Sequence, residues 1–182
     1  MPQPQKLKNF NCFIDGYGQA GKITEIEPPK ITAKLEEHRA GGQDVPTEYD
    51  MGLEKLESTF TLAEYHIGVL KRFGLTLGNS TAMTIRGYAE DERGNSQTIV
   101  IQLRGRLSEQ DPGSWKAGDN AELKGKLTAN YYKLKINGEI IYEIDVENMV
   151  RKIAGVDQLK KQREAIGLAG LPLLEVDAQV NL

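Results

Sequence analysis

The strongest local signal in the chain is the sequence Thr128-Ala-Asn-Tyr-Tyr-Lys-Leu-Lys-Ile-Asn-Gly-Glu-Ile-Ile-Tyr-Glu-Ile-Asp145, in which two strand-forming runs flank Asn137-Gly138. Asn-Gly is the dipeptide best suited to the positive φ angles of a two-residue type I′ turn. The sequence therefore predicts a β-hairpin. In its simplest register the pairs are Ile136 with Glu139, Lys135 with Ile140, Leu134 with Ile141, and Lys133 with Tyr142.

This register places large apolar side chains on both faces of the hairpin. One face would carry Tyr132, Leu134, Ile136 and Ile141, and the other would carry Tyr131, Ile140, Tyr142 and Ile144. A hairpin with one face in water alternates apolar and polar residues, so both faces of this one need a cover. The core of the subunit can cover one face, and a partner subunit is the simplest cover for the other. Lysines beside Ile140 favour the second face as the interface between subunits.

Composition limits the classes of protein to consider. The chain has 182 residues, 27% of them charged and 39% hydrophobic, which fits one globular domain over residues 1–182. A net charge of −3 gives no overall basic field for nucleic acid. The single cysteine, Cys12, excludes an internal disulfide and is expected to pack in a strand. The sequence shows neither a signal peptide nor an apolar run of membrane-spanning length, so we expect no membrane anchor.

The remaining patterns predict a mainly β chain. Alternation and turn signals predict strands at 9–14, through Ile23 and Ile26, from Lys30, and at 47–51, 55–62, 82–89, 97–106 and 122–135. Helical spacing predicts a helix over 63–73 with Gly74 after its end, and a second from an Asp157 N-cap to Ile166, followed by Gly167. Trp115 is expected to pin the loop 111–118 to the body.

The chain carries little that points to catalysis. Gly16, Gly18 and Gly21 fit G-x-G-x-x-G, but the next residues alternate like a strand and end at Pro28-Pro29. A dinucleotide site needs a helix there, so this motif predicts a hairpin turn. The only histidines, His38 and His66, are expected at a surface or an interface. We expect no enzyme activity, cofactor or metal site.

A basic cluster lies on the expected C-terminal helix. It consists of Lys160, Lys161 and Arg163. Cations near a helix C-terminus complement the helix dipole, so a solvated helix end explains the cluster. The alternative is a docking patch for an acidic partner.

Several segments, in the same order along the chain, closely resemble the major tail tube protein of contractile-tailed phages, a family also found in R-type phage-tail-like bacteriocins. In the first half these are Leu7-Lys-Asn-Phe-Asn-Cys-Phe-Ile-Asp-Gly16, Pro29-Lys-Ile-Thr-Ala-Lys-Leu-Glu-Glu-His-Arg-Ala-Gly-Gly42 and Asp50-Met-Gly-Leu-Glu-Lys-Leu-Glu57. In the second half they are Leu103-Arg-Gly105, Asp111-Pro-Gly-Ser-Trp-Lys-Ala-Gly118, Tyr131-Tyr-Lys-Leu134, Tyr142-Glu-Ile-Asp145 and Gly155-Val-Asp-Gln-Leu159. The chain continues past Gly167 for longer than is usual in that family.

The resemblance implies two packed antiparallel sheets with one flanking helix and a short C-terminal helix. It also implies hexameric rings whose inner sheets join into a continuous β-barrel, and rings that stack into a hollow tube. Residues 1–8 would form an N-terminal arm and 168–182 a C-terminal tail. In this family the segment Ala40, Gly41, Gly42, Gln43, Asp44, Val45 and Pro46 reaches toward the next ring.

A tube that passes cargo should have a polar, preferably acidic wall. The strand residues expected to line it are Lys34, Glu36, Glu57 and Thr59. Expected partners are the chain itself, the sheath, tape-measure, baseplate and tail-terminator proteins, and DNA in passage, with assembly in the host bacterial cytoplasm. Lys160, Lys161 and Arg163 would then be candidates for sheath docking. Two alternatives are a tube protein of a type VI-like secretion system or other contractile injection system, and an enzyme with an unrecognised site.

Overall fold

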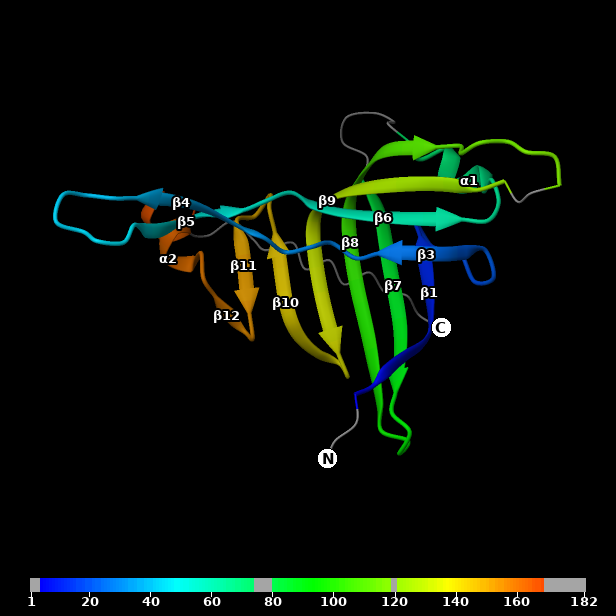
Figure 1. Cartoon of the computed structure of the whole chain (residues 1–182), viewed down its shortest axis with the longest axis horizontal. Helices are drawn as coiled ribbons and strands as arrows, with labels where there is room; N and C mark the ends of the chain where they lie inside the picture. Colours follow the sequence, from blue (N-terminus) through cyan, green and yellow to red (C-terminus); the bar gives the residue numbers. More distant parts are fainter. Residues whose placement is uncertain (1–3, 74–79, 119–120, 169–182) are drawn as a thin grey trace.

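The computed structural model describes residues 4–73, 80–118 and 121–168, which are built mainly of β-strands (Figure 1). Within these residues ten strands form one antiparallel sheet and two form a second. The strands are β1 (Lys6–Ile14), β2 (Tyr17–Gly18), β3 (Ile23–Glu27), β4 (Ala33–His38), β5 (Thr47–Leu53), β6 (Leu56–Leu62), β7 (Thr81–Glu90), β8 (Ser96–Asp111), β9 (Leu123–Ile136), β10 (Glu139–Asp145), β11 (Val150–Ile153) and β12 (Val156–Asp157). The helices of this part are α1 (Ile67–Leu70) and α2 (Lys160–Ala165). The mainly β prediction is confirmed.

The ten-stranded sheet divides into two layers that share β8 and β9. Along one edge β9 pairs with β8, and along the other it pairs first with β6 and then, past Asn130, with β10. The short layer is β3, β6, residues 123–129 of β9 and 105–111 of β8. The long layer is β1, β7, residues 96–104 of β8, 131–136 of β9, β10 and β11. Figure 1 shows the strands of the short layer running across those of the long layer.

One hydrophobic core lies between the layers. Phe60, Leu62 and Leu127 of the short layer belong to the same buried cluster as Met83 and Leu103 of the long layer. Alternation along β6 explains its side of the core, because Leu56, Ser58, Phe60 and Leu62 are buried and the residues between them are not. The predicted packing of two antiparallel layers is therefore present.

Gly105 lies where β8 passes from one layer to the other. The pairing of β8 with β9 shifts register between Arg104 and Gly105, and again between Leu107 and Glu109. A Cβ on Gly105 would lie 2.0 Å from the carbonyl oxygen of Thr128. The two backbones can approach this closely only because the residue has no side chain.

Both predicted Gly-containing turns form. Asp15 and Gly16 have φ angles of 50° and 84°, and Asn137 and Gly138 have 50° and 85°. Positive φ at both central residues is the mark of a type I′ turn. The G-x-G-x-x-G segment is thus a hairpin turn between β1 and β2. The return strand of this hairpin is β2, and the predicted strand through Ile23 and Ile26, β3, pairs with β6 instead.

The predicted register of the Asn137-Gly138 hairpin is correct for two pairs and then wrong. Ile136 pairs with Glu139 and Lys135 with Ile140, but a bulge follows, so Leu134 pairs with Tyr142 and Lys133 with Glu143. An extra residue in one strand reverses the side to which every later side chain points. Tyr142 and Ile144 therefore lie on the core face with Leu134 and Tyr132, and not with Tyr131 and Ile140.

The helices are shorter than predicted. The first starts at Ile67 rather than at residue 63, and its proposed C′ residue Gly74 lies outside the described residues. The second starts at Lys160, because the Asp157 carboxylate accepts a hydrogen bond from the Leu159 N–H before the helix begins. Gly167, with φ of 78°, ends it as predicted. The Gly167 and Leu168 N–H groups then bond the carbonyls of Glu164 and Arg163 in a Schellman motif. At the other end β1 begins at Lys6, within the expected N-terminal arm.

Candidate assembly surfaces

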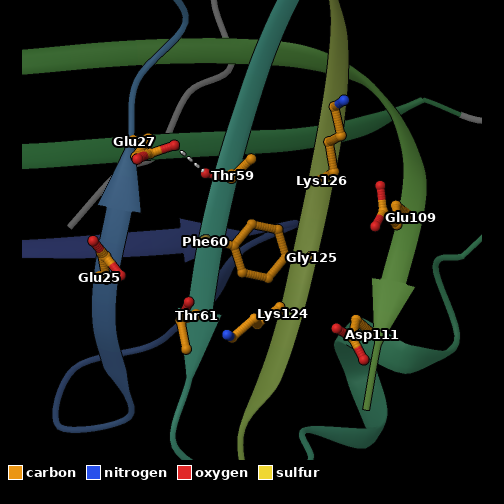
Figure 2. Close-up of a pocket in the computed structure, with 10 residues that line it drawn as sticks. All are labelled: Glu25, Glu27, Thr59, Phe60, Thr61, Glu109, Asp111, Lys124, Gly125 and Lys126. Carbon is orange, nitrogen blue, oxygen red and sulfur yellow. Dashed lines mark hydrogen bonds between the residues drawn. The ribbon is translucent and has the colours of Figure 1, made fainter. Parts of the chain in front are cut away.

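The outward face of the short layer is polar and ordered in rows. Residues opposite one another on neighbouring strands share a face of the sheet. The rows are Glu25–Thr61–Lys124–Asp111, Glu27–Thr59–Lys126–Glu109 and Glu57–Thr128–Arg106. Figure 2 shows the carboxylates of β3 and β8 flanking the threonines and lysines of β6 and β9. They line a shallow depression of about 290 Å³.

Acidic side chains outnumber basic ones on this face, five to three. The Lys126 Nζ lies 2.9 Å from a carboxylate oxygen of Glu57, and this hydrogen bond, with the charge of Glu57, raises the pKa of Lys126. The neighbour of Glu27 in its row is Thr59, not a cation, and the Thr59 hydroxyl donates a hydrogen bond to the Glu27 carboxylate at 2.8 Å. The acids on β3 are thus less well compensated than those beside the lysines of β9.

Two of the four residues expected to line a lumen lie on this face. Glu57 and Thr59 alternate outward along β6. Lys34 and Glu36 belong to β4, which pairs only with β5 among the described strands and forms a separate sheet. Within the subunit the four residues therefore lie on two separate sheets.

Both edges of the short layer lack a full strand partner within the described residues. Among the described strands β3 pairs only with β6. On β8 the pairing with β7 ends at Gly105, and beyond it the described residues on that side add one isolated bridge, from Leu107 to Phe73. Glu109 to Asp111 pair with β9 alone among the described strands. Backbone N–H and C=O groups at such edges can pair with another chain.

The arm, defined as β4, β5 and residues 39–46, projects from the body (Figure 1). All residues from Ala33 to Met51 are exposed, including the large apolar side chains of Leu35, Val45, Tyr49 and Met51. Its tip has local order, because the Gln43 side chain accepts a hydrogen bond from the Ala40 N–H at 3.0 Å. The predicted segment Ala40–Pro46 is this tip.

An apolar groove of about 370 Å³ lies where the arm joins the body. Leu53 and Leu56 line it from the arm side, with Ile144, Val150 and Leu159 from the long layer and its C-terminal extension. The Arg151 guanidinium lies 2.9 Å from the Asp50 carboxylate and ties the base of the arm to β11.

The four hairpin residues expected at an interface are divided between two faces. Ile144 is 4% exposed in the subunit's own core, and Tyr142 packs against that core, so neither is available to a partner. Ile140 is 40% exposed on the outward face, as an interface residue should be. Tyr131 shares that face and donates a hydrogen bond from its hydroxyl to Glu143.

Glu143 is the centre of a charge cluster on the same face. Desolvation alone would raise its pKa, but hydrogen bonds from Lys152 and Tyr131 and the charge of Lys133 hold the pKa below its ordinary value. The Arg104 guanidinium lies over the Tyr131 ring, 5.4 Å from its centroid. These contacts link Tyr131, Lys133 and Lys152 through Glu143 on the outward face of the hairpin.

The basic cluster on α2 also divides, into one residue bonded within the subunit and two exposed lysines. Arg163 donates hydrogen bonds to the Asp157 carboxylate at 2.6 Å and to the Met149 carbonyl at 2.8 Å, and its side chain is 16% exposed. It is therefore a residue that holds the helix against the β10–β11 turn, not a docking residue. Lys160 and Lys161 are exposed and remain available.

The remaining residues singled out from the sequence are His38, His66, Cys12 and Trp115. His38 is exposed at the end of β4 against Tyr49, and His66 precedes α1 with its ring beside that of Tyr17. Cys12 is fully buried, and burial raises its pKa to about 12. Trp115 holds the loop 111–118 by donating a hydrogen bond to the Tyr65 hydroxyl, although the residue is 77% exposed. Among the described residues no group of His, Cys, Asp and Glu is placed to hold a metal ion, and none of their helices could cross a membrane.

Sequence reasoning missed most of the polar face. It did not single out Glu25, Glu27, Glu109 and Asp111, nor Lys124 and Lys126. Each run alternates, which shows that these side chains point away from the core. Alternation does not show that β3, β6, β9 and β8 are neighbours, and only that pairing brings the charges together.

The fold is shared with solved parts of contractile machines. A chain of the sheath/tube terminator of an extracellular contractile injection system, PVC, has a TM-score of 0.57 at 12% identity, over 74% of this chain and 98% of that one. A chain of the PVC sheath–tube complex has a TM-score of 0.54 at 13% identity, over 72% and 91%. At these identities the likeness shows a shared fold, the fold class of tube components of contractile machines.

Within that class the chain belongs to the phage tail tube protein FII family, whose model matches residues 4–167. The tail tube protein of Escherichia phage P2 is 34% identical over 92% of this chain and all of its own length. The major tail tube protein of Serratia phage KSP20 is 29% identical over 93% of this chain and all of its own length. The chain is thus a structural tail tube protein of a contractile phage tail or tail-like particle, as its sequence predicted, and the phage-type reading is preferred over a type VI-like one.

Proposed function

We propose that six copies join through the edges of the short layer into a ring, with the outward face of that layer lining a central channel. The observation that carries this proposal is the coincidence of two open edges and a polar face on one four-stranded layer. Pairing β3 of one copy with the free part of β8 in the next satisfies both edges and closes a barrel. The channel wall then carries Glu25, Glu27, Glu57, Glu109 and Asp111 against three cations.

Rings would stack through the arm. Its exposed apolar residues and its reach beyond the body support a contact with the next ring, and the groove at its base offers apolar surface nearby. The arm has no second cover in the described subunit. In this role Ala40–Pro46 is the ring-stacking segment.

The tube would serve as a conduit for DNA, or as the puncturing core of a headless particle. An acidic wall does not adhere to a polyanion, which supports passage of DNA. The outward face of the long layer, including Tyr131 and Ile140, together with Lys160 and Lys161, would meet the sheath. A tape-measure protein in the channel, baseplate and terminator proteins at the tube ends, and assembly in the bacterial cytoplasm complete the proposal. Such a role requires no catalysis or cofactor.

Negative-stain electron microscopy of the purified protein tests this function. Hollow polymers of constant diameter are the expected result. Isolated rings that never stack would favour a secretion-type ring. Compact monomers at every concentration would contradict an assembly role.

A further inference from the structure

The two open edges of the short layer carry the same sign of charge. On the channel-facing side, β3 has Glu25 and Glu27 and its partner strand β6 offers threonines opposite them. On the same side β8 has Glu109 and Asp111. The cations of this face, Lys124, Lys126 and Arg106, lie on β9 and at the inner end of the β8 segment. Figure 2 shows this order across the sheet, with acids on both outer strands and lysines within.

Edge-to-edge pairing would therefore bring two acidic columns together. Neighbouring strands lie about 4.8 Å apart, so the β3 carboxylates would stand beside the β8 carboxylates of the next copy. Like charges directly opposite one another destabilise a strand pair. The lysines of β9 would be one strand further away, about twice that distance, so their attraction for the β3 carboxylates is weaker than the repulsion.

We infer that this charge pattern keeps free subunits apart, so that ring closure depends on screening or neutralisation of the seam between copies. The inference rests on the proposed function, because it requires β3 and β8 to meet. Charged residues on exposed strand edges are a common protection against uncontrolled pairing. Here the same carboxylates have a second use as the channel wall, so one set of residues controls when the tube forms and what it repels once formed.

Three cations close to this layer are already paired within the subunit. Glu57 is occupied by Lys126, its partner at 2.9 Å. Lys22 pairs with Glu64 at 2.6 Å, and Arg72 pairs with Asp15. None of these cations is free to bridge the two columns.

Assembly kinetics at different salt concentrations test the inference. At 0.01 M salt charges interact over about 30 Å, and at 0.1 M over about 10 Å. Light scattering of the wild-type protein should show assembly that is roughly tenfold slower at 0.01 M than at 0.1 M salt. The double variant E109Q/D111N should assemble rapidly at both concentrations, and electron microscopy should show that its product is still a tube.

A charge-matched control separates the seam from net charge. E92Q/E139Q removes two exposed carboxylates at the far end of the long layer, one in the turn between β7 and β8 and one at the start of β10. It should keep the wild-type salt dependence. Equal salt dependence in E109Q/D111N and wild type would overturn the inference while leaving the tube intact. Absence of tubes in wild type at every salt concentration would overturn the proposed function and the inference with it.

Discussion

At the residue scale, one glycine decides whether the two layers can share a strand. The backbone of β9 occupies the space that a side chain at position 105 would need, and the nearest atom is a backbone oxygen that cannot rotate away. Changing Gly105 to Ala should lower the free energy of unfolding by about 1–3 kcal/mol or prevent folding. Gly41, whose added Cβ would meet nothing within 4 Å, gives the matched control. Chemical denaturation would refute this account if G105A and G41A were equally stable.

The Asp157–Arg163 pair predicts a pH dependence of stability. Burial alone would raise the pKa of Asp157, but hydrogen bonds from Arg163 and the Leu159 N–H hold the pKa below its ordinary value. The carboxylate therefore stabilises the fold above its unfolded pKa of about 3.9, and this contribution is lost as the pH falls through the folded value. D157N should cost about 1.5–3 kcal/mol at neutral pH.

The difference between D157N and wild type should shrink as the pH falls below about 4. R163A should behave like D157N in thermal unfolding, whereas K161A should be neutral because Lys161 is exposed. A stability gap between D157N and wild type that stays constant down to pH 2 would argue against a depressed pKa.

At the element scale, the hairpin shows how far sequence reasoning reaches. Its turn was predictable because Asn137-Gly138 is a local signal that needs no tertiary context. Its faces were not, because the bulge beside Ile140 has no local signature and reverses the sides of Tyr142 and Ile144. The same difference between local and tertiary signals applies to β3. The sequence predicted this strand, but it did not predict that the strand pairs with β6.

The corrected faces give a sharper test of the hairpin. Leu134 packs against the core and Ile140 is 40% exposed. L134D should unfold the subunit, since an unpaired carboxylate beside apolar surface costs several kcal/mol. I140D should remain folded by circular dichroism and show weaker binding to the sheath or to other copies. An unfolded I140D would show that this face is structural.

The arm should be dispensable for folding and required for stacking. In the described structure the hydrogen bonds of residues 41–45 stay within the arm, joining Gln43 to Arg39 and Ala40. Their deletion should leave the melting temperature within a few degrees of wild type and yield rings without long tubes. Size-exclusion chromatography with electron microscopy measures both properties. Long tubes from the deletion variant would remove the stacking role from this segment.

At the scale of the whole molecule, the described residues enclose a core and leave other surfaces uncovered. Among these residues the short layer has two edges without a full strand partner, and the arm has exposed apolar side chains. The fold class and the family could be predicted from the sequence, since alternating strands and the segments that resemble the family cover most of the chain. The polar outward face of the short layer was not predictable, because it is made by four strands that come together only in the folded chain.

Disulfide trapping across the seam tests the central claim most directly. Strands about 4.8 Å apart fall within the Cα separation of about 4.4–6.8 Å that a disulfide accepts. Each double variant carries one cysteine on each edge, in place of Glu25 or Glu27 on β3 and of Glu109 or Asp111 on β8. All four combinations are tested because the register across the seam forms only on assembly. The native Cys12 is fully buried and should not form a disulfide in this experiment.

Oxidised tubes of at least one double variant should give a covalent ladder that ends at the hexamer on a non-reducing gel. The corresponding single variants, and K135C on the outward face of the long layer, should give no ladder. Tubes that form normally while none of the four double variants cross-links would contradict the pairing of β3 with β8, and with it the assignment of the channel wall.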